Sequence, residues 1–246
     1  MSIIVGLAHS VRTLDALLVE TYGEPKWSSK LDGISELVLT ILSQHTSDIN
    51  SGAAFDALTD HSHSDWNAVS AMPVEELTQV IRSAGLSNIK ARRIQQVLHE
   101  ILDRRGSLDL GFLQELPIAD GRAWLTSLNG VGPKTAACVL LFSYGLPVMP
   151  VDTHVHRVSG RLGLIGPKVT ADRAHDLLVT LVPPDRVYAF HINLIRHGRQ
   201  VCKAGVPRCH LCPLTRQCDY FLSRATTTGQ VSRAAPAKKG RAERAT

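Results

Sequence analysis

Apolar residues recur at helical spacing along almost the whole chain, and this pattern limits the folds open to it. Spacings of three and four residues place side chains on one face of an α-helix. Two such stripes are Ile34, Leu37, Val38, Ile41, Leu42 and Ile94, Val97, Leu98, Ile101, Leu102. Strand-like alternation is nearly absent, since the short segment 147–151 carries two prolines. The sequence predicts an all-α protein of about ten short helices. Helices are expected over residues 119–128, 133–144, 153–162, 171–182 and 186–201, among others.

The length and composition exclude several classes of protein. A chain of 246 residues suits one large domain or two small ones, and 44% hydrophobic residues exclude wholesale disorder. No apolar run approaches the roughly 18 residues of a membrane helix. Residues 1–10 lack the basic start of a secretory signal. We therefore expect a cytoplasmic protein without membrane contact, in which cysteines stay reduced.

The net positive charge is concentrated in one segment. The chain carries a formal charge of +5, but without residues 224–246 it holds 21 basic and 21 acidic residues. This last segment also lacks apolar periodicity, which is typical of disorder. A disordered basic tail adds sequence-independent affinity for phosphates, or it is an inert extension. Charge alone does not choose between the two.

Four of the five cysteines fall within 17 residues and predict a metal centre. Cys202, Cys209, Cys212 and Cys218 form the pattern C-x6-C-x2-C-x5-C. Four thiolates hold either a tetrahedral zinc ion or an iron–sulfur cluster. Zinc sites of this kind usually pair two C-x2-C turns, and only one occurs here, so the spacing favours iron–sulfur over zinc. Cys138, on an apolar helix face, is expected to be a buried small side chain.

Residues 128–136 join two predicted helices through a glycine turn. Gly130 and Gly132 permit a tight hairpin, and Pro133 suits the first position of the following helix. Backbone N–H groups at such a helix start bind phosphates without reading sequence. The alternative is a plain corner in which the glycines only make the turn, and both interpretations stay open on the turn alone.

Two titratable residues follow this turn at a fixed interval. Lys134 lies in the first helical turn, where it is either a solvated surface lysine or an amine kept neutral and nucleophilic by its surroundings. Asp152 follows 18 residues later and is placed to cap a helix. A carboxylate there would also stabilise a positively charged sugar centre. Neither residue decides the function alone.

Together these motifs resemble the endonuclease III family of the helix-hairpin-helix, Gly-Pro-Asp DNA glycosylase superfamily. The ordered match is L-x-G-V-G-x-K-T-A, then V-D-T-H, then the four-cysteine pattern, with further similarity at residues 42–48, 85–88 and 195–199. It covers roughly residues 30–220. The resemblance implies a two-domain helical fold: a six-helix domain over 27–146, and a discontinuous iron–sulfur cluster domain over 1–26 and 147–222. A disordered basic tail over 223–246 would follow.

The resemblance also implies the roles of individual residues. Lys134 would be the nucleophile and Asp152 the accompanying acid, and the four cysteines would ligate a 4Fe–4S cluster. DNA with a damaged base or an abasic site would be the partner of a monomeric enzyme. Further DNA contacts would come from Gly130, Val131 and Gly132 of the hairpin, from Gln44 or His45 in the gap left by a flipped base, from Leu86 as a wedge, and from Lys203 and Arg208 beside the cluster. Leu86 is otherwise a helix-terminal core leucine.

The implied activity is that of a bifunctional DNA N-glycosylase and AP lyase of base excision repair, acting on oxidised pyrimidines. Two alternatives stay open: a non-catalytic DNA-binding paralogue, and a monofunctional mismatch or adenine glycosylase. Three departures from the family pattern motivate them. Asn129 replaces a frequent proline, Pro133 replaces a usual basic residue, and His45 occupies the place of a glutamine in an ungapped alignment.

Overall fold

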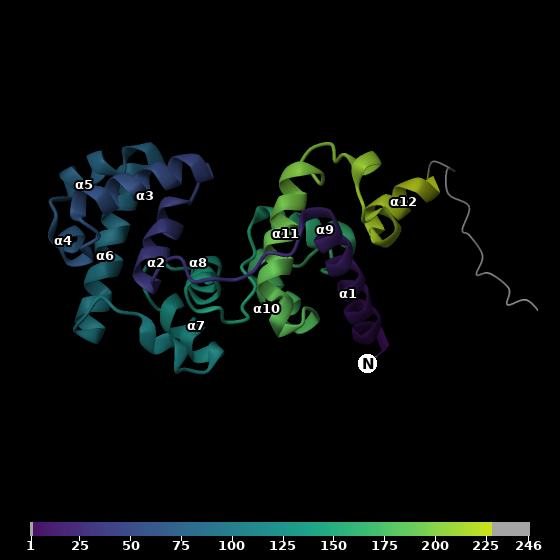
Figure 1. Cartoon of the computed structure of the whole chain (residues 1–246), viewed down its shortest axis with the longest axis horizontal. Helices are drawn as coiled ribbons and strands as arrows, with labels where there is room; N and C mark the ends of the chain where they lie inside the picture. The colour runs from purple at the N-terminus through teal and green to yellow at the C-terminus, as the bar shows by residue number, and fades with distance from the viewer. Residues whose placement is uncertain (1, 228–246) are drawn as a thin grey trace, which may run out of the picture.

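Twelve α-helices make up most of residues 2–227, the part of the chain that this computed structural model describes (Figure 1). No strand occurs within this range, so the all-α prediction is confirmed. The helices are α1 (Ser2–Tyr22), α2 (Gly33–Leu42), α3 (Asp48–Ser62), α4 (Trp66–Ala71), α5 (Val74–Val80), α6 (Ser87–Arg105), α7 (Ile118–Thr126), α8 (Pro133–Cys138), α9 (Thr153–Leu162), α10 (Ala171–Leu181), α11 (Val187–Gln200) and α12 (Asp219–Thr227).

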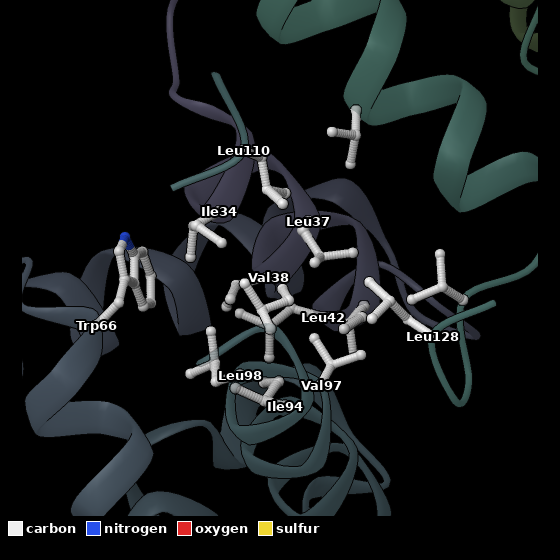
Figure 2. Packing of buried hydrophobic residues seen from close by; sticks show 14 of the residues in the cluster. Ile34, Leu37, Val38, Leu42, Trp66, Ile94, Val97, Leu98, Leu110 and Leu128 are labelled. Atoms are coloured by element: carbon white, nitrogen blue, oxygen red, sulfur yellow. The ribbon is translucent and has the colours of Figure 1, made fainter. Parts of the chain in front are cut away.

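The buried apolar side chains form two clusters, each within one of the two lobes visible in Figure 1. The first lobe holds α2 to α8 and is built around α2, whose residues are nearly all buried. Side chains of α2 meet those of α6 in its centre, and Leu128 approaches from the hairpin side (Figure 2). The two apolar stripes recognised in the sequence thus pack against each other.

The second lobe joins the two ends of the described chain. Helix α1 packs against α11, and α9 to α12 complete the cluster. Arg186 fastens α1 to this lobe, because its Nε donates to Asp15 Oδ2 at 2.7 Å and its Nη1 donates to Glu24. This arrangement supports a discontinuous second domain, and the boundaries at residues 26 and 146 stay a proposal.

The segment predicted as a helix over residues 133–144 is helical throughout, but only part of it is α-helix. α8 ends at Cys138, and one wider π-helical turn runs over Val139–Ser143. Val139 and Leu140 pack in the first cluster, whereas Leu141 packs in the second. The wider turn lies where consecutive side chains face different hydrophobic clusters. The apolar periodicity of the sequence does not predict this turn.

The sequence-based prediction places the start of the disordered tail too early, at residue 223. α12 runs to Thr227, because Tyr220 and Phe221 pack against the second cluster and anchor the helix. The remainder of the predicted tail, residues 228–246, lies outside the described residues. None of the described helices combines the length and apolar character needed to cross a bilayer.

Candidate active site

The glycine turn forms a closed hairpin between α7 and α8. Gly130 has a φ of 83°, a conformation that side chains other than glycine rarely adopt. The Val131 N–H donates to the Leu128 carbonyl at 3.1 Å and closes the turn. Gly132 then caps α8 in an extended conformation, and Pro133 occupies the first helical position. The predicted conformations of both glycines and of Pro133 are therefore present.

Two side chains of α6, those of Arg93 and Glu100, contact the hairpin. A Cβ atom on Gly130 would lie 2.9 Å from the side chain of Arg93, and Arg93 Nη1 donates to Gln44 Oε1 at 2.7 Å. The Asn129 N–H donates to Glu100 Oε2 at 2.9 Å. A proline at position 129 would lack this N–H. Asn129, which stands where the family often has proline, thus allows a hydrogen bond between the hairpin and α6.

The close approach of Arg93 makes a specific prediction for the turn. Gly130→Ala should lower the free energy of unfolding by about 1–2 kcal/mol, because alanine is strained at positive φ, and it should also displace Arg93. Gly132→Ala is the matched control. Its φ is −90°, and nothing lies within 4 Å of the added Cβ, so its cost should stay within about 0.5 kcal/mol. Urea unfolding of both variants measures the difference, and equal losses would contradict this account.

Lys134 and Asp152 influence the pKa values of the same two buried side chains, His191 and Cys138. Lys134 is half-buried in the first turn of α8, and Asp152 caps α9 by accepting the Val155 N–H at 2.7 Å. Burial lowers the pKa of His191 to about 4, while the nearby Asp152 carboxylate raises it and the Lys134 ammonium lowers it. The structure thus brings the two predicted residues around one point between the lobes. It also shows Asp152 in its capping role.

Cys138 lies at the same point, buried as expected. Burial raises the pKa of its thiol to about 11; among smaller effects, Lys134 lowers this pKa and Asp152 raises it. The thiol therefore stays neutral at physiological pH.

A second carboxyl group at this point, besides that of Asp152, was not predicted from the sequence. Glu36 of α2 is buried, and this burial raises its pKa to about 7 against the opposing effects of the Thr40 hydroxyl and the Lys134 ammonium. The available signal was a single acid within the apolar stripe of α2, next to Leu37 and Val38. Acids are almost never buried without a partner.

The predicted base-contacting residues lie at exposed, conformationally restricted positions. His45 and Leu86 both adopt left-handed conformations, with φ of 55° and 50°. Both side chains are exposed, Leu86 by 56%, so Leu86 is not a core leucine. Gln44 is half-buried and held by Arg93, while His45 points to the surface. These positions leave Leu86 and His45 free to meet a ligand.

One ion pair links the two lobes next to these residues. Arg199 Nη2, near the end of α11, lies 2.6 Å from Asp48 Oδ2 at the start of α3. Asp48 follows Gln44 and His45 closely, and Arg199 precedes the loop that carries Lys203 and Arg208. Lys203 and Arg208 are both exposed, and Lys203 Nζ donates to the Arg199 carbonyl. The cysteine loop and the segment with His45 therefore lie on the same side of the molecule.

The four predicted ligands line one pocket in the second lobe. The lining of the pocket consists of Cys202, Cys209, Cys212 and Cys218 together with apolar residues such as Val158 and Phe221. In the range 2–227, no three His, Cys, Asp or Glu side chains come close enough together to hold a single metal ion.

Hydrogen bonds from outside the cysteine segment reach the pocket. Arg161 Nη1 donates to Cys202 Sγ at 3.3 Å, and His197 Nε2 lies 3.6 Å from Cys212 Sγ. Tyr22 of α1 pairs with the other ring nitrogen of His197 at 3.0 Å. Burial raises the pKa of Cys212 to about 11, so its thiolate needs a positive partner. This connection from α1 to the pocket could not be predicted from the cysteine pattern.

A comparison with family models decides where this arrangement belongs. Residues 38–184, which include the hairpin, Lys134 and Asp152, match the model described as "HhH-GPD superfamily base excision DNA repair protein". The chain belongs to this superfamily. The match covers more than half of the chain, and the recognition of the endonuclease III family in the sequence is likewise confirmed by several similar endonucleases III.

Individual members of the superfamily differ in how much of their length corresponds to this chain. Endonuclease III of Thermotoga maritima is 31% identical over 200 residues, covering 81% of this chain and 89% of the bacterial protein. Protein ROS1C of Oryza sativa is 30% identical over 176 residues, or 65% of this chain. The chain spans only about 10% of that plant protein. Two similar plant proteins correspond to it over 13% of their length.

A solved structure shares the fold as well as the sequence pattern. The trapped covalent intermediate of an endonuclease III with DNA superposes with a TM-score of 0.75 at 29% identity. The superposition covers 88% of this chain and 98% of that one. The two-lobed helical arrangement in Figure 1 is therefore the superfamily fold.

Proposed function

We propose that this protein is a bifunctional DNA N-glycosylase and AP lyase of base excision repair. The observation that carries the proposal is the placement of Lys134 and Asp152 around one buried point directly after the hairpin. A half-buried amine and a carboxylate that both influence the same buried imidazole suit nucleophilic catalysis at a carbon that develops positive charge. Related proteins that bear the names endonuclease III and DNA glycosylase/AP lyase support this reading.

The reaction uses Lys134 as the attacking group. Its neutral amine attacks C1′ of a nucleotide turned out of the duplex, the bond to the base breaks, and the electron pair leaves with the base. The Asp152 carboxylate stabilises the positive charge at the sugar. A proton then passes from this nitrogen to O4′ as the C1′–O4′ bond breaks, which opens the sugar ring and leaves a protonated Schiff base. That Schiff base acidifies the C2′ hydrogen, so that β-elimination breaks the strand on the 3′ side.

The exposed residues around the site suit a bent DNA duplex. The hairpin over Gly130–Gly132 would bind a phosphate through its backbone, and Lys203 and Arg208 would bind others from the cysteine loop. Leu86 and His45 would enter the helix near the lesion. A damaged base costs less to unstack than an intact one, which fits oxidised or ring-saturated pyrimidines as substrates.

We propose a 4Fe–4S cluster as the occupant of the cysteine pocket. The four thiols line one pocket with apolar walls, and their spacing, with a single C-x2-C turn, fits an iron–sulfur cluster better than one zinc ion. Cys202, Cys209, Cys212 and Cys218 would be its ligands. The cluster holds the loop with Lys203 and Arg208 in shape and takes no part in the reaction at C1′.

Borohydride trapping on duplexes with thymine glycol, with an abasic site or without damage tests the proposal. A reduced covalent adduct on both modified duplexes, absent on the undamaged one, is the expected result. Base release without any adduct would instead identify a monofunctional glycosylase. DNA binding without base release or adduct would identify a non-catalytic paralogue.

A further inference from the structure

A carboxyl group is buried inside the first lobe, beside the helix that carries Lys134. Glu36 is 9% exposed and lies in the middle of α2. Its Oε1 accepts a hydrogen bond from the hydroxyl of Thr40, one helical turn later, at 3.1 Å. Thr40 is itself buried. A buried acid in an apolar core costs stability, so we expect Glu36 to have a functional role.

Thr40 connects this carboxyl group to α8. α2 packs directly on α8, and the Thr40 hydroxyl also forms a hydrogen bond with the thiol of Cys138. Cys138 lies four residues after Lys134, and such a pair shares one face of a helix. The faces of α2 and α8 that meet here therefore carry Glu36 and Lys134, and the positive charge of Lys134 lowers the pKa of Glu36.

We propose that Glu36 accepts the proton that Lys134 must lose before it attacks C1′. The step breaks one N–H bond of the ammonium, leaves its electron pair on nitrogen and forms an O–H bond on the carboxylate. Glu36 does not touch the nucleotide. It acts through Lys134 by setting the protonation state of the attacking amine, so it is a positioning residue and not a catalytic one. The inference rests on the proposed function and adds to it the source of the neutral amine.

The environment of Glu36 suits this exchange. Burial raises its pKa to about 7, so the carboxyl group changes its charge near physiological pH. A charged carboxylate and a charged ammonium group lose solvation when DNA covers the site, whereas a neutral acid and a neutral amine lose much less. Binding of DNA therefore drives the proton from nitrogen to oxygen at the moment when the amine is needed.

The other groups around Glu36 do not take this role. Cys138 of α8 stays protonated, and His191 of α11 stays neutral, because burial moves the pKa of each away from neutrality. Asp152 is held at the start of α9 by the Val155 N–H. Lys90 of α6 donates to the Leu42 and Ala84 carbonyls at the far end of α2.

Trapping at an abasic site as a function of pH tests the inference. Under single-turnover conditions the wild-type rate should rise with a midpoint near pH 7, where Glu36 becomes able to accept a proton. Glu36→Gln cannot accept one, and we expect it to be slower by about 10²-fold at pH 7. The deficit should shrink at alkaline pH, since solvent then removes the lysine proton. An unchanged profile, or the same loss at every pH, would overturn the inference.

Thr40→Val provides a matched variant that keeps Glu36. The lost hydroxyl stabilises the charged carboxylate, so its removal should raise the pKa of Glu36. The midpoint of the rate profile should then move to higher pH while the alkaline rate stays close to that of wild type. A midpoint that does not move would separate the rate from the charge of Glu36 and overturn the inference.

Stability measurements show whether Glu36→Gln folds. The pKa of Glu36 rises from an ordinary 4.5 to about 7 on folding, so the native state binds the proton more tightly than the unfolded state. The free energy of unfolding of the wild type should therefore fall as pH rises from 4.5 to 7. Glu36→Gln should lack this part of the fall, and urea unfolding at several pH values compares the two.

A titration of Glu36 without any substrate tests its coupling to Lys134 separately from the proposed glycosylase and lyase activity. In protein labelled with ¹³C at glutamate carboxyl groups, the Glu36 signal is assigned by its loss in Glu36→Gln. Lys134→Gln removes a positive charge, so the pKa of Glu36 should rise above about 7. An unchanged titration would overturn the coupling even in an active enzyme. Failure of the wild type to form any adduct would overturn the proposed function, and the inference with it.

Discussion

Lys134→Gln should form no borohydride adduct and should lose strand cleavage at an abasic site by more than about 10³-fold. Glutamine has a similar size but offers no amine, so no Schiff base can form. Without that intermediate, the C2′ hydrogen is no longer acidified and the strand stays intact. Stability should change little, because Lys134 is only half-buried.

The matched control for Lys134 is another lysine with the same change of charge. Lys168 lies exposed between α9 and α10, outside the site. Lys168→Gln should trap and cleave like the wild type. Gel analysis after borohydride treatment and after mild heating distinguishes adducts from cleaved strands. Adduct formation by Lys134→Gln would show that a different amine attacks, and equal losses in both variants would reduce Lys134 to a contributor of positive charge.

Base release by Lys134→Gln on thymine-glycol DNA is a separate measurement. Asp152 is still present in this variant and can stabilise positive charge at C1′ while water attacks. Slow release of the base with no strand cleavage is therefore compatible with the proposed function. Release at the wild-type rate would identify a monofunctional enzyme, in which Lys134 plays no chemical part.

The parts of this fold that depend on local sequence could be predicted, and α2 and α6 show why. Their apolar residues recur at helical spacing, and Asp32 accepts the N–H groups of Ile34 and Ser35 at the start of α2 as an N-cap. The hairpin was equally accessible, since Gly130 must supply a positive φ. Such features follow from a few neighbouring residues, so a single sequence contains them.

The features that depend on contacts between distant segments could not be predicted. Arg93 is one of several basic residues on α6, and only the folded chain places it between Gly130 and Gln44. Glu36 is coupled to Lys134 because α2 and α8 pack together, almost a hundred residues apart in the chain. The π-helical turn after Cys138 likewise depends on two cores that meet there. The spacing of motifs singled out Lys134 as a candidate nucleophile, but it gave no indication of the buried groups around this residue.

Loss of a pocket cysteine should have the second large effect, on the whole second lobe. Cys212→Ala removes one of the four proposed ligands of the cluster. If the proposal holds, the wild-type protein is brown with about four irons per chain, and the variant should lose both the colour and the iron. Structural metal sites supply on the order of 10 kcal/mol of folding free energy, comparable to the entire stability of a domain. We therefore expect the cysteine segment to unfold and α1 to loosen, since Tyr22 reaches the pocket through His197.

Cys138→Ala is the control for this variant, because it removes a buried thiol from the first lobe and leaves the pocket intact. It should keep iron and colour. Iron analysis, visible absorption and protease digestion compare the two proteins. The first lobe of Cys212→Ala, with its separate core, should resist digestion, whereas DNA affinity should fall because Lys203 and Arg208 lose their fixed positions. A colourless wild-type protein with stoichiometric zinc would overturn the cluster, and a Cys212→Ala protein with unchanged digestion would show that the pocket holds its shape without a metal centre.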